Sequence, residues 1–219
     1  MHFDVVWENR NFLLQGLQTT VAISVFGILL SLALGVVVGG LRTYARAPFT
    51  WVCALYVDVI RSIPFLVILV WLFFVPPLLV GIGVPPFWTG VLALGLHGGA
   101  YLAEIVRAGL TSIRQGQQRA GLALGMTHLT VVRRIVLPQA IIRMLPPTGT
   151  YSGSIINKSA IASVIAVEEL TRQAQLLSSV TIRPFEIFTI VLVVYSLLVY
   201  GVVRGVESIY RRLAPLGAS

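Results

Sequence analysis

Charged side chains are scarce in this sequence: they make up 11% of its 219 residues, whereas hydrophobic residues make up 57%. Soluble domains carry about 25% charged residues. A chain of this length could not cover a water-facing surface with so few charges, so the bilayer must be part of its solvent. The composition excludes a water-soluble enzyme and predicts an integral membrane protein.

Residue types that build metal and nucleotide sites are also few. Cys53 is the single cysteine and lies in an apolar stretch, which excludes a disulfide framework and a cysteine-rich metal site. The three histidines are scattered, so we expect no metal site. No Gly-x-x-x-x-Gly-Lys-(Ser/Thr) phosphate loop occurs, so the chain cannot cradle ATP in that way. We therefore expect no cofactor in this chain.

Long apolar runs are plentiful, and a membrane-spanning helix needs about 20 mostly apolar residues. Five spans are predicted, at about residues 17–41, 51–75, 87–105, 148–167 and 185–206. The second ends at Pro76-Pro77, and the fourth is interrupted by Asn157 and Lys158. We expect an all-α integral membrane fold of five spanning helices in a single domain, residues 1–219. Short cytoplasmic helices should lie in a loop over residues 107–147.

Positive charge lies mainly between the apolar runs. The net charge is +8, and fifteen of the sixteen cations are arginine. With the N-terminus outside, eleven arginines fall on the inner side: Arg42, Arg46, Arg107, Arg114, Arg119, Arg133, Arg134, Arg143, Arg204, Arg211 and Arg212. Only Arg10, Arg172 and Arg183 fall outside, so the positive-inside rule predicts an outer N-terminus and a cytoplasmic C-terminus. Charge confined to loops, rather than spread along a polar face, argues against nucleic-acid binding.

Glycines recur four residues apart within the predicted spans. This spacing lets helix backbones approach closely in lipid. The pairs are Gly35 with Gly39, Gly95 with Gly99, and Gly201 with Gly205. Five helices are few for a complete transporter, so we expect the chain to associate with itself or with a partner subunit.

The arginine-rich segment has its own pattern. It contains no acid between Arg107 and Arg143, and apolar residues recur there at helical spacing. Gly125 permits a tight turn between two short amphipathic helices, and Pro138 is expected to stop the second. The apolar faces of these helices must be buried against the membrane surface, the spans or a soluble partner.

Several motifs, in this order and spacing, resemble those of ABC importer permeases of the polar amino acid uptake family. They are Arg61-Ser-Ile-Pro64, Ala100-Tyr101 with Glu104 and Arg107-Ala108, Gly116-Gln117, Ala123-Leu-Gly-Met126 and Leu137-Pro-Gln-Ala140. The resemblance extends over nearly the whole chain and is closest to glutamate/aspartate permeases. It implies a bacterial inner (plasma) membrane protein that performs no covalent chemistry.

The resemblance also implies partners and a coupling site. Two permeases, homodimeric or heterodimeric, would work with two cytoplasmic ATPase subunits, which bind ATP, and with an extracytoplasmic amino-acid-binding protein. The coupling residues would be Arg119, Ala120, Gly121, Leu124, Gly125, Met126 and Pro138. The family pattern Glu-Ala-Ala is replaced here by Arg119-Ala120-Gly121, which changes the electrostatics of ATPase docking. One hypothesis is an unequal pair whose second permease keeps the glutamate.

Ionisable residues inside spans are costly, so they tend to be paired or functional. The candidates for the substrate pathway are Arg61, His97 and Lys158. Arg61 could instead be neutralised by Asp58 one turn away, and His97 could simply form an interhelical hydrogen bond. Lys158 has no acid within a turn, so a partner helix or a substrate carboxylate could bind it.

Two acidic motifs have plainer interpretations. Glu104 and Arg107 lie one turn apart and are predicted to form a structural pair. Glu168 and Glu169 end the fourth span and are expected to form a solvated rim, with contact to the binding protein as the alternative.

Excess cations in the spans favour an acidic amino acid as the substrate, with glutamine, histidine and basic amino acids as alternatives. Two other classes compete with the importer. A stand-alone ion-coupled secondary transporter would need neither ATP nor partners, but the sequence has no obvious inverted repeat. A non-transporting membrane scaffold could rest its amphipathic loop on anionic lipid, but the charges within its spans would then have no use.

Overall fold

The computed structural model describes residues 4–214, and every regular element in that range is helical. The elements are α1 (Asp4–Glu8), α2 (Arg10–Tyr44), α3 (Phe49–Ser62), α4 (Phe65–Val80), α5 (Pro86–Thr111), α6 (Gln115–Ala123), α7 (His128–Val131), the π-helix η1 (Val132–Val136), α8 (Leu137–Ser159), the 3-10 helix η2 (Ala160–Ile165), α9 (Leu170–Thr181) and α10 (Pro184–Leu213). The all-α prediction is confirmed.

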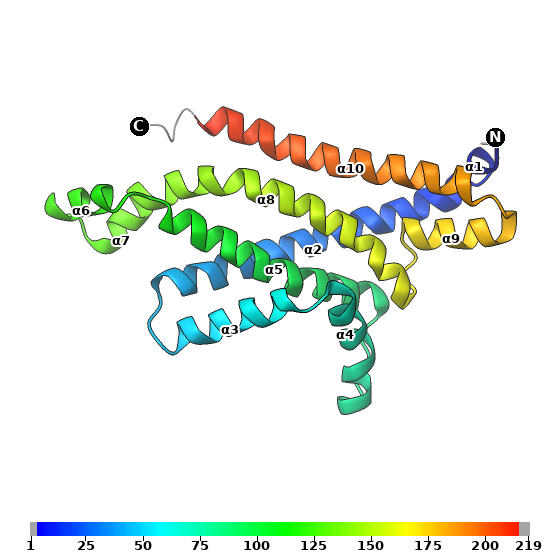
Figure 1. Ribbon diagram of the computed structural model, residues 1–219, viewed down its shortest axis with the longest axis horizontal. Helices are drawn as coiled ribbons and strands as arrows, with labels where there is room; N and C mark the ends of the chain where they lie inside the picture. The colour runs from blue at the N-terminus through cyan, green and yellow to red at the C-terminus, as the bar shows by residue number, and fades with distance from the viewer. Residues whose placement is uncertain (1–3, 215–219) are drawn as a thin grey trace.

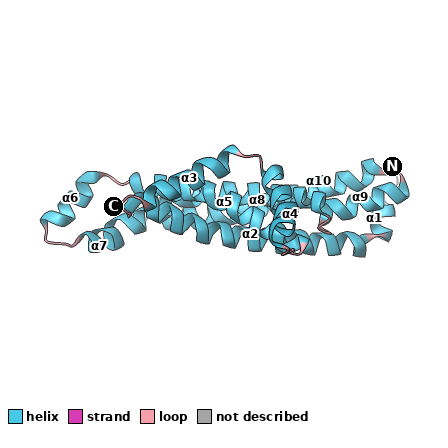
Figure 2. Cartoon of the chain, turned by 90° about the horizontal axis from the view of Figure 1, so that it is seen from below, coloured by secondary structure: helices cyan, strands magenta, loops and turns pink. Residues whose placement is uncertain are grey.

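The long helices α2, α5, α8 and α10 run beside one another along the long axis of the molecule (Figure 1). Helices α6 and α7 project at one end, close to the end of α10, and α1 and α9 lie at the opposite end (Figures 1 and 2). Helix α4 turns away from this bundle. The arginine-rich segment is therefore gathered at one extremity of an elongated helical slab.

Small residues let α2 and α5 pack closely. A Cβ atom added at Gly35 would lie 2.5 Å from Leu102 Cβ, and one at Gly95 would meet the side chain of Leu30. The Ser31 hydroxyl also donates to the Leu94 carbonyl across this contact, at 3.0 Å. Two of the predicted glycine pairs thus lie at a helix contact. Gly201 and Gly205 make no such contact within residues 4–214, where nothing lies within 4 Å of their Cβ positions.

The second predicted span, residues 51–75, is not one straight helix. It is divided into α3 and α4, whose axes differ by 105°. Pro64 explains the break, since proline disfavours a helical conformation in the residue before it, and Ile63 is extended at ψ 132°. Helix α4 also continues beyond the predicted end at Pro76-Pro77. It extends to Val80 and is capped by Gly81, with φ 70°.

The fourth predicted span, residues 148–167, corresponds to the second half of α8 and to η2, but α8 begins earlier, at Leu137. Pro138 therefore does not stop a helix, because residues 128–159 are helical throughout, with a π turn at η1. In the π turn before it, the Leu137 N–H bonds to the Val132 carbonyl, and Pro138 occupies the first turn of α8, where no N–H is required.

Apolarity and length distinguish α8 from the other long helices. Of the described residues, α2, α5 and α10 form helices long and apolar enough to cross a membrane, and the bent pair α3–α4 passes the same test together. Helix α8 does not pass it, but it packs between α5 and α10, with Gly149 against Val206 and Gly153 against Val199. We treat it as the fifth helix of the bundle.

Candidate functional site

The three predicted pathway residues meet at one place. Arg61 comes from the end of α3, His97 from α5 and Lys158 from the end of α8. Lys158 Nζ lies 3.5 Å from His97 Nδ1 and 5.2 Å from the centre of the Tyr101 ring. The Arg61 guanidinium lies 5.0 Å from the same ring centre. One aromatic ring therefore has both cations near it.

A second tyrosine completes this group. The Tyr151 ring stacks on Tyr101 with centroids 4.9 Å apart and an angle of 16°. Its hydroxyl lies 3.3 Å from His97 Nδ1 and accepts a hydrogen bond from Lys158 Nζ, also at 3.3 Å. We call Arg61, His97, Tyr101, Tyr151 and Lys158 the cation–aromatic cluster. Cations over aromatic faces are favourable, and more so when they are desolvated.

Sequence reasoning missed the tyrosines of the cluster. Tyr101 was considered only as part of a family motif, and Tyr151 not at all. A usable signal was present, because Tyr101 lies four residues after His97 and Tyr151 seven residues before Lys158. Both spacings place the paired side chains on one face of a helix.

The break between α3 and α4 adjoins the cluster. Phe65, the first residue of α4, contacts the His97 ring edge-on with centroids 5.4 Å apart. Tyr56 of α3 donates to the Leu96 carbonyl at 2.6 Å and ties α3 to α5. Irregular backbone at membrane depth is tolerated only where protein buries it or where it lines a cavity. The broken helix and the cluster therefore belong to one site.

Asp58 does not neutralise Arg61 in this structure. Within residues 4–214, no ion pair joins Asp58 to Arg61, and no carboxylate pairs with Lys158. The pairing predicted as one alternative for Arg61 is therefore not seen in this structure. Glu104 interacts electrostatically with Arg61 without forming an ion pair with it. The two cations, set against aromatic faces, can bind a carboxylate and pack against an aliphatic chain.

Glu104 has a different role from the cluster. It pairs with Arg107 in the same helix, as predicted, and also accepts a bond from Arg42 of α2 at 2.7 Å. This carboxylate is therefore shared by two arginines, and it ties α5 to the end of α2.

The solvated rim predicted for Glu169 is wrong. Glu169 has no exposed surface and caps α9, accepting bonds from the backbone N–H groups of Thr171 and Arg172 at 2.8 and 2.7 Å. The Tyr195 hydroxyl of α10 also donates to it at 2.7 Å. Burial raises the pKa of Glu169, and these hydrogen bonds partly oppose that shift. Glu168 alone is exposed.

The predicted coupling residues lie mainly on α6 and on the turn after it. Gly121 packs against η1, where an added Cβ would lie 2.9 Å from Ile135. Gly125 adopts φ +81°, as expected for a tight turn, and Leu124 beside it is 80% exposed. Arg119 and Ala120 are exposed and Met126 is half-buried, whereas Pro138 lies in a separate element, α8.

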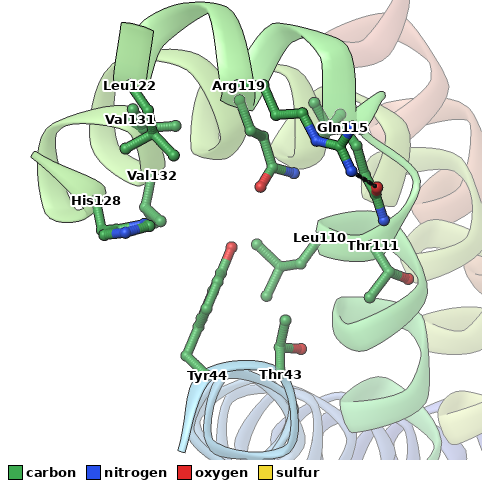
Figure 3. Close-up of a pocket in the computed structure, with 12 residues that line it drawn as sticks. Thr43, Tyr44, Leu110, Thr111, Gln115, Arg119, Leu122, His128, Val131 and Val132 are labelled. Atoms are coloured by element: carbon green, nitrogen blue, oxygen red, sulfur yellow. Dashed lines mark hydrogen bonds between the residues drawn. The ribbon is translucent and has the colours of Figure 1, made fainter. Parts of the chain in front are cut away.

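A cavity of about 410 Å³ separates this segment from the ends of α2 and α5 (Figure 3). It is lined by Thr43, Tyr44, Leu110, Thr111, Ile113, Gln115, Gln118, Arg119, Leu122, His128, Val131 and Val132. Its lining combines apolar side chains with hydroxyl, amide, imidazole and guanidinium groups.

Residues 27–214 match the family described as binding-protein-dependent transport system inner membrane component. The glutamine transport system permease protein GlnP of Escherichia coli (strain K12) is 34% identical over 90% of this chain and 92% of its own length. The probable glutamine ABC transporter permease protein GlnM of Bacillus subtilis (strain 168) is 32% identical over 97% and 98%. The glutamate/aspartate import permease protein GltK of Escherichia coli O6:H1 is 33% identical over 74% and 76%.

Chains of solved ABC transporter structures superpose on this one. An amino acid ABC transporter crystallised with histidines has a chain that superposes with a TM-score of 0.89 at 32% identity, covering 97% of this chain and 99% of that one. The MetNI methionine ABC transporter, in an inward-facing conformation, superposes at 0.81 with 23% identity and the same coverage, which supports the fold.

Proposed function

We propose a transport role for the cation–aromatic cluster of this chain, which belongs to the family of binding-protein-dependent transport system inner membrane components and is a permease subunit of an amino acid ABC importer. The chain is not an enzyme, and the ATPase of such importers is a separate subunit. The cluster would contact the amino acid during its passage, and α6 with the following turn would receive the motion of the ATPase.

The working complex would contain two permeases, two ATP-binding subunits and an extracytoplasmic binding protein. Leu124 and Leu129 support an ATPase contact, because both are large, apolar and mostly exposed on the segment predicted to couple. Exposed apolar side chains on a short polar segment favour a protein partner. Arg119, Ala120, Gly121, Gly125 and Met126 would shape this surface, and Pro138 would set the start of α8 behind it.

The proposed topology places the N-terminus outside and the C-terminus in the cytoplasm. Its support is the gathering of α6, α7 and the end of α10 at one extremity, which carries most of the arginines (Figure 1). Positive charge of this kind favours the cytoplasmic side. The same extremity would then face the ATPase.

The proposed substrate is an acidic amino acid. The observation that carries this proposal is the convergence of Arg61 and Lys158 near the Tyr101 ring, with no carboxylate paired to either within residues 4–214. Two cations can bind the two carboxylates of such a substrate. The N-terminus of α4, at the helix break, would add the positive end of a helix dipole.

Glutamine is the second candidate, and the names of two relatives favour it. Its α-carboxylate would use one cation of the cluster. Its amide would then need a hydroxyl partner, and Tyr151 is the side chain best placed to supply one.

Ligand-induced thermal stabilisation of the purified complex, without binding protein, tests this assignment. A ligand that binds the folded state raises the unfolding temperature. We expect glutamate and aspartate to raise it, arginine to have no effect, and Lys158→Met to abolish the effect. Arg143→Gln is the matched control, because it removes an exposed cation that bonds only to Ser112 among the described residues. Stabilisation by glutamine alone would favour the second candidate, and stabilisation by arginine would contradict an acidic substrate.

A further inference from the structure

A cavity lies between the coupling segment, which we define as residues 115–136 (α6, α7 and η1), and the ends of α2 and α5. The transport role above assigns it no ligand, although Arg119 of its lining also belongs to the surface proposed to contact the ATPase. The cavity is large enough for a small ligand, since such pockets usually measure about 300–1,000 Å³. Its lining contains no Asp or Glu, but it contains Arg119, His128 and the hydroxyl of Tyr44. The cavity therefore offers hydrogen-bond donors and positive charge without a competing carboxylate.

The surroundings strengthen this positive character. Arg42 and Arg46 flank the lining residues of α2, and Arg114 precedes α6. The acid closest in the chain to this end of α5, Glu104, is already held by Arg42 and Arg107. The Arg119 guanidinium bonds to Gln115 Oε1 at 3.3 Å and pairs with no carboxylate in the described part of the chain. An anion entering the cavity would meet a cation free to bind it.

The level of the cavity in the membrane indicates that its anion is a lipid headgroup. Tyr44 ends the apolar helix α2, and its side chain stands upright toward the gap, beside Leu110 (Figure 3). Tyrosine at the end of a span marks the headgroup level of a membrane. Leu110, Ile113 and Leu122 form an apolar part of the same lining. Basic pockets between helices on the cytoplasmic side of membrane proteins bind anionic lipid headgroups.

We propose that this cavity binds the headgroup of an anionic phospholipid, with Arg119 on the phosphate, His128 across the cavity from it on the polar headgroup, and the apolar residues against the glycerol and the first acyl carbons (Figure 3). The lipid would bridge α6 and α7 to the ends of α2 and α5. It would thereby tie the coupling segment to the membrane-embedded helices.

Native mass spectrometry of the whole purified complex, extracted from mixed phosphatidylcholine and phosphatidylglycerol vesicles, tests the proposal. We expect the wild type to retain phosphatidylglycerol selectively and Arg119→Gln to retain it about tenfold less, because a charge-assisted hydrogen bond is lost. Arg134→Gln is the matched control: it removes one exposed arginine outside the cavity and should retain the lipid. Val132→Trp fills the cavity without changing charge and should also lose the lipid.

The other outcomes overturn the proposal. Equal loss of lipid in Arg119→Gln and Arg134→Gln would indicate diffuse surface attraction. Binding of inorganic phosphate, with no lipid retained in its absence, would indicate a free-anion site. Equal retention of both lipids, or full retention in Val132→Trp, would exclude a headgroup site in this cavity. Far-UV circular dichroism and thermal unfolding of each variant show whether the fold is intact.

Discussion

At the scale of single residues, buried ionisable side chains join helices that are distant in sequence. Lys158, Arg61 and His97 come from three helices and lie in one cluster, as the cost of ionisable groups inside spans leads one to expect. Glu169 follows an apolar run, where the sequence predicts exposure to solvent. It is buried because the start of α9 and Tyr195, which is distant in sequence, surround its carboxylate.

Glu169→Ala is expected to destabilise the complex. The substitution leaves the N–H groups of Thr171 and Arg172 and the Tyr195 hydroxyl without their acceptor, and each unsatisfied buried group costs about 1–3 kcal/mol. Thermal unfolding in detergent measures the effect. Glu168→Ala is the control and should change little, because that neighbour is exposed. Equal unfolding temperatures for the two variants would remove the capping role from Glu169.

At the scale of elements, periodicity predicted most helices and missed their junctions. The spans at residues 17–41, 87–105 and 185–206 lie within α2, α5 and α10. The break at Pro64 was hidden because both sides of it are apolar. The π turn before Pro138 depends on backbone bonds that no composition reveals. Helix α9 had a signal, since its buried Leu170, Gln173, Ala174 and Leu177 follow helical spacing.

The α2–α5 contact predicts opposite effects for two alanine substitutions in one helix. Gly35→Ala places a methyl group against Leu102 and should cost about 1–3 kcal/mol, as overpacking does. Gly40→Ala meets nothing within 4 Å and should stabilise α2 slightly, by about 0.5–1 kcal/mol, because alanine is the better helix former. Chemical or thermal unfolding of the purified complex compares them. Equal effects would mean that α2 and α5 do not meet at Gly35.

At the scale of the whole molecule, the structure combines a bundle, a broken helix and a protruding coupling segment. The cluster lies where α3, α4, α5 and α8 converge, and the coupling segment lies at the arginine-rich end (Figures 1 and 2). Such an arrangement separates the proposed amino acid path from the proposed contact with the ATPase. Motion at α6 and α7 would reach the cluster through η1, which contacts both of them and α8, and then through α8, which packs against α5.

Uptake of labelled amino acid into proteoliposomes tests the central claim most directly, with the binding protein outside and ATP trapped inside. The account predicts uptake that requires ATP, fails in Gly125→Val and persists in Gly116→Ala. Gly125 needs φ +81°, which a β-branched residue avoids, whereas an added Cβ at Gly116 meets nothing within 4 Å. Uptake that proceeds without ATP and tolerates Gly125→Val would contradict the account and favour a stand-alone transporter.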